Sequence, residues 1–432
     1  MRGLLAKLVR GDITRRDFTR RMFGMGFGMM TVESILDNVA RGQGRHKGGG
    51  AKLAAGFRAE PFSELTPYEQ WLEREGVPVH KGYHVPDVRA LQYGEWARFG
   101  ARGALINLEG AEATDGAYVL EVAPGATTTP ARFMFEESLY VLDGEGETTV
   151  WHEGRPRQTF TWQKGALFSP PLNTWRQYRN TGRTPARLVC VMDLPLTMDL
   201  YHNADFIFNN DFVFRDRYDR QPDYFTVNQS KMKAGGSAAT YGEGDKGGVT
   251  VLDTGLVPNL NELRLFASQG RGLKNKSAEV VLSDNSMQSH VSEFETGTYK
   301  RAHRHGPGSH VLALGGVGYS LMWTNVPKYS EAPKQVRVDW KDGTLFVPPD
   351  RWFHQHFNTG ETPAKYMATT WIGGKYFVKG LGGGGRTHRL NTISHKHGGN
   401  MIDYADEDPA IRVMFEEELR KNGVEVRMPS KS

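Results

Sequence analysis

Cysteine is almost absent from this chain, and its scarcity limits the metal chemistry that the protein can support. Cys190 is the only cysteine among 432 residues, and it lies in the apolar run 187–192. One thiol cannot form an intrachain disulfide, and it cannot supply the several thiolates of a structural zinc site or an iron–sulfur cluster. A metal site would therefore be built from histidine, and we expect Cys190 to be a buried strand residue.

Long apolar runs are also missing. The run Met22 to Met30 near the N-terminus is too short to span a membrane. It follows Thr14-Arg15-Arg16-Asp17-Phe18, which resembles a twin-arginine export signal. We therefore expect residues 1–57 to be a signal and linker, and the protein to be periplasmic or secreted. A basic amphipathic helix on a cytoplasmic protein is the alternative.

An excess of positive over negative charge is absent outside this N-terminal segment. The net charge of +5 resides largely in the first 60 residues. A basic patch on a folded domain would be needed to hold a nucleic acid, so we expect no nucleic-acid partner.

Glycine, proline and histidine are what the chain does contain. The 51 glycines and 21 prolines favour a turn-rich β architecture. Five of the 14 histidines lie in two short segments, at positions His303, His305, His310, His354 and His356. Side chains at i and i+2 of a strand share one face, so each H-x-H pair projects together. Neutral imidazole binds iron, copper, nickel and zinc, and two such strands facing one another would form a metal site.

The two segments resemble the paired motifs of the cupin superfamily. In the first, Gly297 is followed by five residues, then His303 and His305, then His310 where the motif has Glu, and Gly316. In the second, Gly343, Pro349, His354 and Asn358 stand at the spacing of the motif, with Arg351 where the motif has Gly. The resemblance implies a metal site of His303, His305, His310 and His354.

The first half of the chain repeats in the second. Gly125 corresponds to Gly297 and Leu142 to Leu314, at an offset of 172 residues in both cases. The run 165–171 corresponds to 343–349 at an offset of 178. We therefore predict an all-β protein of two tandem cupin (double-stranded β-helix, jelly-roll) barrels with a few peripheral helices.

The expected organisation follows from this repeat. We predict a connecting segment with a short helix at 58–100, a first barrel at 101–200, an inter-barrel connection at 201–270, a second barrel at 271–375, and a Gly-rich loop with a helix at 376–432. Thr66 is the expected cap of the first helix and Asp408 of the last. The last helix has its apolar Ile411, Met414, Phe415 and Leu419 on one face.

The repeat also serves as an internal control. At these offsets Ala131 and Phe133 stand opposite His303 and His305, while Arg176 and Tyr178 stand opposite His354 and His356. The histidines thus belong to a function of the second barrel alone. Glu136 and Glu137 of the first barrel lack partners for a metal site, and we expect them at the surface or at an oligomer contact.

Ligands without a carboxylate leave the metal its full positive charge, which favours an anionic substrate. Similarity to cupins with three-histidine iron sites implies a non-haem Fe²⁺ dioxygenase for a small anionic or aromatic substrate. His303, His305 and His354 would bind the metal, His310 would be a fourth ligand or a base, and His356 would hydrogen-bond substrate or act as acid or base.

Two alternatives stay open. The metal could act only as a Lewis acid in a lyase, isomerase or decarboxylase, or the bicupin could bind a metal or small molecule without catalysis. Mn, Ni, Cu and Zn are alternatives to iron. The expected partners are a small-molecule substrate and, for a dioxygenase, dioxygen; no stable membrane span is expected, and a homo-oligomer is left open.

Overall fold

The computed structural model describes residues 57–226, 232–233, 251–324, 326–371, 375–376, 390 and 393–429. The twin-arginine-like segment and the Gly-rich run 380–385 lie outside these residues. None of the described helices combines the length and apolarity that a membrane crossing requires.

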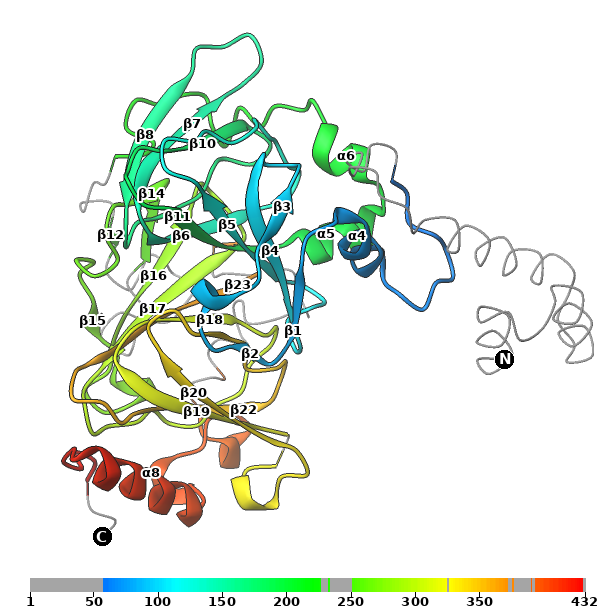
Figure 1. The fold of residues 1–432 in the computed structure, drawn as a ribbon. Coiled ribbons are helices and arrows are strands. Elements are labelled where there is room, and N and C mark those ends of the chain that lie inside the picture. Colours follow the sequence, from blue (N-terminus) through cyan, green and yellow to red (C-terminus); the bar gives the residue numbers. More distant parts are fainter. Residues whose placement is uncertain are drawn as a thin grey trace, which may run out of the picture. The chain divides into compact units, whose positions relative to one another are not determined.

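The described chain forms two β barrels, each made of a large and a small sheet (Figure 1), which confirms the predicted fold class. The large sheet of the first barrel contains β1 (Val79–Gly82), β3 (Gly94–Trp96), β4 (Ala101–Leu108), β5 (Gly116–Val122), β6 (Glu137–Asp143), β9 (Leu167–Phe168), β11 (Ala186–Met192) and β14 (Leu256–Val257). Its small sheet contains β7 (Glu145–Trp151), β8 (Gln158–Gln163) and β10 (Trp175–Asn180).

The second barrel repeats this plan. Its large sheet contains β2 (His84–Val85), β12 (Met232–Lys233), β13 (Val251–Thr254), β15 (Phe266–Ala267), β16 (Lys276–Leu282), β17 (Gln288–Phe294), β18 (His310–Gly315), β21 (Leu345–Phe346) and β23 (Ala364–Thr370). Its small sheet contains β19 (Val317–Trp323), β20 (Gln335–Lys341) and β22 (Phe353–Asn358).

Backbone pairing confirms the repeat at residue level. The isolated antiparallel bridge Ala131–Arg176 in the first barrel corresponds to His303–His354 in the second. The bridge Thr127–Arg179 corresponds in the same way to Tyr299–Phe357. Both pairs keep the offsets of 172 and 178 residues, so the positions compared in the sequence occupy equivalent places in the two barrels.

The two barrels exchange short strands. β2, which precedes the first barrel, pairs with β21 of the second, and β14, which precedes the second barrel, pairs with β9 of the first. Residues 58–100 and 201–270, expected to be connections, thus contribute strands to both large sheets. The sheets therefore begin earlier than the expected boundaries at 101 and 271.

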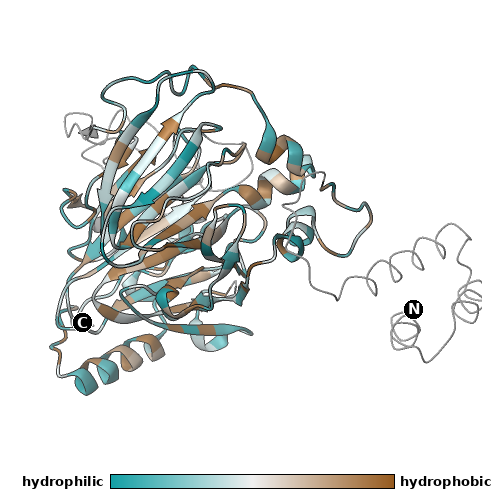
Figure 2. Ribbon diagram, turned by 45° about the horizontal axis from the view of Figure 1, so that its top comes forward, coloured by the Kyte–Doolittle hydropathy of each residue, from teal (hydrophilic) through white to brown (hydrophobic). Residues whose placement is uncertain are grey.

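The large sheets also share a core. β5 is buried along its whole length, because Tyr118 and Leu120 face the barrel interior while Ala117 and Val119 face the other barrel. Strands at the periphery, such as β8, instead alternate between buried and exposed residues. Figure 2 shows the corresponding concentration of hydrophobic residues on the strands, with many hydrophilic residues in the loops.

The predicted helices are present. α4 (Pro67–Glu75) begins with a capping box of Thr66 and Glu69, and α8 (Pro409–Asn422) begins at Asp408, whose side chain accepts from the Ala410 amide. Ile411, Phe415 and Leu419 of α8 are buried. The other helices of the described residues are α5 (Leu194–Tyr201) and α6 (Ala204–Asn209), with 3₁₀ segments at Val88–Ala90, Gln269–Arg271, Tyr329–Glu331, His395–His397 and Tyr404–Asp406.

Candidate metal centre

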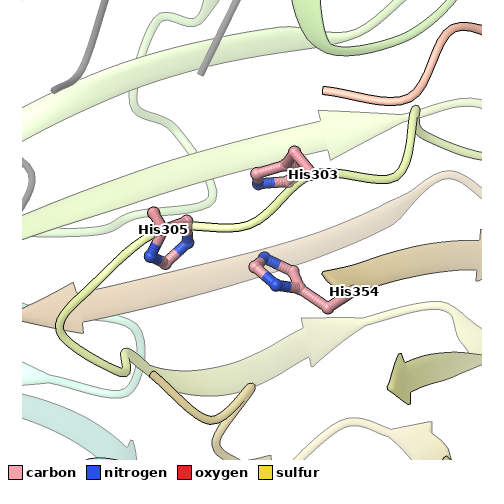
Figure 3. A group of neighbouring side chains, drawn as sticks. All are labelled: His303, His305 and His354. Atoms are coloured by element: carbon pink, nitrogen blue, oxygen red, sulfur yellow. The ribbon is translucent and has the colours of Figure 1, made fainter. Parts of the chain in front are cut away.

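Three of the predicted histidines converge at one point of the second barrel (Figure 3). His303, His305 and His354 each offer a ring nitrogen, and these atoms lie within 4.8 Å of one another. The backbones of His303 and His354 exchange hydrogen bonds of 3.1 and 2.8 Å. This antiparallel bridge places both side chains on the same face, with ring centroids 4.3 Å apart.

Backbone carbonyls orient the three rings. The Nδ1 atoms of His303, His305 and His354 lie 3.2, 3.3 and 3.2 Å from the carbonyl oxygens of Arg301, Pro307 and Trp352. A carbonyl oxygen only accepts, so each Nδ1 carries the proton and each Nε2 keeps its lone pair. The Nε2 atoms are thus the ones that could bind a metal, which is the arrangement that outer hydrogen bonds impose on metal-binding histidines.

The three rings are also held in the neutral form that a metal requires. Burial lowers the pKa of His303 and of His354 well below the ordinary value, with further lowering from the neighbouring histidines and Arg271. Burial and Arg271 lower the pKa of His305 to about 4. Three neutral imidazoles with no carboxylate in the group suit a divalent transition metal and leave coordination positions for other ligands.

His310 does not belong to this group. It begins β18 opposite Thr369, whose hydroxyl bonds Ser289, and the Ser289 hydroxyl lies 3.3 Å from that of Ser138 in the first barrel. The strand alternates, so Val311 faces the barrel interior while His310 faces the other barrel. The sequence motif predicted His310 as a fourth ligand or a base. Because side chains alternate along β18, that of His310 points away from the three histidines.

The surroundings of His310 differ accordingly. Its side chain is fully buried, and neither ring nitrogen has a hydrogen-bond partner in the described structure. Burial alone lowers its pKa to about 3.

His356 lies beside the three histidines, on the same face of β22 as His354. Its ring centroid is 5.6 Å from that of His354 and 5.0 Å from that of Tyr366. Its Nδ1 is 2.8 Å from the Ser320 hydroxyl, which also accepts from the indole of Trp340. Burial lowers the pKa of His356 well below its ordinary value, so the ring is neutral.

Two basic side chains near the histidines were not predicted from the sequence. Nη1 of Arg271 lies 3.1 Å from Nε2 of His303. Lys300 is fully buried, and its ammonium group donates to the hydroxyls of Ser292 and Tyr366 at 2.6 Å each. Burial lowers the pKa of Lys300 well below its usual range.

The repeat contained the signal that would have found them. At an offset of 172, Phe99 stands opposite Arg271 and Thr128 opposite Lys300. Both positions thus hold a basic residue in the second barrel and an uncharged residue in the first. Arg271 and Lys300 lie outside the two H-x-H pairs, so the spacing of the histidines does not point to them.

The equivalent place in the first barrel is filled by an ion pair. Arg176, at the position of His354, pairs with Glu137, and its guanidinium lies 3.9 Å from the centre of the Phe133 ring. Glu136 accepts from Arg217 at 2.8 Å and from the backbone amides of residues 286 and 287 in the second barrel. The expected surface position of Glu136 and Glu137 was wrong, since their exposed fractions are 6% and 1%.

The two barrels have the cupin fold, and a comparison with known protein families supports this for part of the chain. Residues 118–192, in the first barrel, match the cupin domain family. No curated protein sequence matches the chain.

Solved structures with a similar chain path include oxalate decarboxylases. A variant from Bacillus subtilis is 14% identical with a TM-score of 0.43, covering 73% of this chain and 82% of that chain. The formate complex from Lactobacillus farciminis is 12% identical with a TM-score of 0.44, covering 73% and 92%. A second B. subtilis structure, described for its Mn(II) centres, is 13% identical with a TM-score of 0.43, covering 73% and 82%.

Proposed function

We propose that the second barrel is a divalent-metal site of an enzyme that acts on a small anionic substrate by Lewis-acid chemistry, as a lyase, isomerase or decarboxylase. The observation that carries this proposal is the convergence of three neutral imidazoles beside Arg271 and Lys300. The three histidines include no carboxylate to offset the charge of a metal, and Glu279, which acts electrostatically on Lys300, is paired with His290 at 2.5 Å. An anion would therefore be attracted to this part of the barrel.

Each side chain has a role in this proposal. His303, His305 and His354 hold the metal, which when bound polarises a carboxylate or carbonyl of the substrate. Arg271 orients the anion through its planar set of donors. His356, held at Nδ1 by Ser320, presents its other nitrogen for proton transfer next to the Tyr366–Lys300 pair.

A dioxygenase is the second candidate, because a three-histidine set leaves coordination positions that substrate and dioxygen could share. Proton-transfer groups favour the Lewis-acid reaction: His356, Tyr366 and Lys300 form a contiguous buried set beside the ligands. Fe²⁺ is the expected metal of a dioxygenase, whereas Mn, Ni, Cu or Zn could also act as the Lewis acid in the other reaction.

Metal analysis and oxygen uptake separate the two. Protein purified without an affinity tag from its native source should contain about one divalent metal per chain, and should convert a small carboxylate without consuming oxygen. Iron together with stoichiometric oxygen uptake would favour the dioxygenase, and a chain that binds no metal would refute both. The twin-arginine-like segment also leads us to propose that the protein is exported. Fractionation of cells from the native source should then place it outside the cytoplasm.

A pair of substitutions tests the site directly. His303→Ala removes a ligand and should abolish bound metal and activity. Tyr178→Phe changes the position of the first barrel equivalent to His356 and should leave metal content unchanged, because that barrel lacks the histidines. Metal content measured by mass spectrometry after dialysis checks both, and equal metal in the two variants would contradict the assignment.

A further inference from the structure

Arg271 engages the atom that the metal would bind. Its Nη1 lies 3.1 Å from Nε2 of His303, the nitrogen left free by the hydrogen bond at Nδ1. A guanidinium has donors and no acceptor, so its N–H points at the lone pair of Nε2. That lone pair cannot serve the guanidinium and a metal ion at once.

We propose that Arg271 is a built-in competitor for the metal site: it occupies the His303 lone pair in the metal-free protein, leaves it when metal binds, and then contacts the anion bound beside the metal. This inference rests on the proposed metal site and adds a coupling between metal and anion binding.

Backbone hydrogen bonds hold Arg271 next to the segment that carries His303. The Arg271 carbonyl accepts from the Arg301 amide at 3.0 Å, and the next residue, Gly272, bridges to Lys300. The residue is therefore anchored beside the segment that carries His303. Its half-buried side chain can leave the lone pair by rotamer changes alone, without movement of the sheet.

Arg271 also lacks the partner that a structural arginine would have. Within the described part of the chain it forms no ion pair, whereas nearby Arg301 pairs with Asp403 at 3.5 Å and Arg304 lies over the Phe353 ring. A half-buried guanidinium without a carboxylate partner is available to an anionic ligand once it is released from the imidazole.

In the first barrel, which lacks the histidines, the position equivalent to Arg271 holds a different residue. Phe99 occupies the equivalent place: its carbonyl accepts from the Thr129 amide at 2.7 Å, as that of Arg271 accepts from Arg301. Phe99 packs edge-on against Phe133, the counterpart of His305, with centroids 5.8 Å apart. Shared backbone geometry does not call for an arginine, so Arg271 accompanies the histidines.

Titration of the metal-free full-length chain with Co²⁺ tests the proposal, with calorimetry and the absorption of bound Co²⁺ as readouts. Arg271→Met should bind Co²⁺ about tenfold to a hundredfold more tightly, because the charged hydrogen bond no longer competes. Arg301→Met removes a nearby charge without touching His303 and should change the affinity less than about threefold. If Arg271→Met does not fold, Arg271→Phe replaces it in the test, because phenylalanine is the residue at the equivalent position of the first barrel.

Acetate tests the second half of the inference. Saturating acetate should tighten Co²⁺ binding to the unaltered chain, where the freed guanidinium meets the anion, and should have less effect on Arg271→Met. Equal Co²⁺ affinity of Arg271→Met and the unaltered chain would overturn the inference while leaving the metal site intact. Failure of every chain to bind Co²⁺ would refute the proposed metal site and the inference with it.

Discussion

At the scale of single residues, the five motif histidines have three different surroundings. His303, His305 and His354 donate hydrogen bonds from Nδ1 to backbone carbonyls, so the lone pair of each Nε2 could bind a metal. His356 is held by a hydroxyl, and His310 has no hydrogen-bond partner in the described structure. The same type of side chain is thus suited to bind a metal, to transfer a proton or only to fill a buried space, depending on the groups that surround its nitrogens.

The isolation of His310 leads to a prediction about pH. Its pKa is lowered to about 3 in the folded chain, against 6.5 in the absence of burial. As the pH falls below 6.5 the unfolded chain gains this proton and the folded chain does not, so the folded state loses stability down to about pH 3. His310→Leu should remove that contribution and reduce the stability lost between pH 6.5 and 5 by about 1–2 kcal/mol.

Urea unfolding of both metal-free chains at pH 6.5 and 5 measures this difference. The variant should also bind as much metal as the unaltered chain, since His310 faces the other barrel. Loss of metal from His310→Leu would show that this histidine reaches the site after all.

At the scale of elements, the small sheet of the second barrel supports the site from behind. β22 carries His354 and His356 on one face and Phe357 on the other. Phe415 of α8 packs on Phe357 and Tyr299, with centroid distances of 5.8 and 4.9 Å. The C-terminal helix therefore backs the strand that positions a ligand.

Truncation of Phe415 should therefore be costly. Phe415→Ala removes a fully buried ring and should lower the free energy of unfolding by about 3–5 kcal/mol. Val413 lies on the same helix but is 55% exposed, so Val413→Ala should change stability by less than about 0.5 kcal/mol. Denaturant titration of both variants gives the comparison, and similar small losses would mean that α8 is not part of the core.

Elements differed in how well the sequence predicted them. α4 and α8 were predicted because their caps and first-turn prolines are local signals. The strand exchange by β2 and β14 was not, because each strand has two residues and carries no periodic pattern. The histidine triad followed from spacing, whereas Arg271 and the burial of Glu137 depend on contacts between distant segments that no local pattern records.

At the scale of the whole molecule, the two barrels are physically joined. They exchange strands, share a hydrophobic core, and are linked by the hydrogen bonds of Glu136 to residues 286 and 287. One barrel cannot unfold without exposing the shared core of the other. We therefore expect the pair to unfold as one cooperative unit.

Cys190 provides a probe of this coupling. It is fully buried in β11 of the first barrel, as expected, and it is the only thiol of the chain. Co²⁺ at about 100 times its dissociation constant should slow labelling of Cys190 about 100-fold in mild denaturant, although the metal binds in the other barrel. In His303→Ala the same Co²⁺ should have no effect, and unchanged labelling in the unaltered chain would show that the barrels open independently.

The most direct test of the metal centre is anomalous diffraction from crystals of the chain loaded with Co²⁺. We predict one strong peak per chain, at bonding distance from Nε2 of His303, His305 and His354, with the Arg271 guanidinium moved away from His303. A peak beside Arg176 and Glu137 in the first barrel, or three imidazoles that share no ion, would contradict the account.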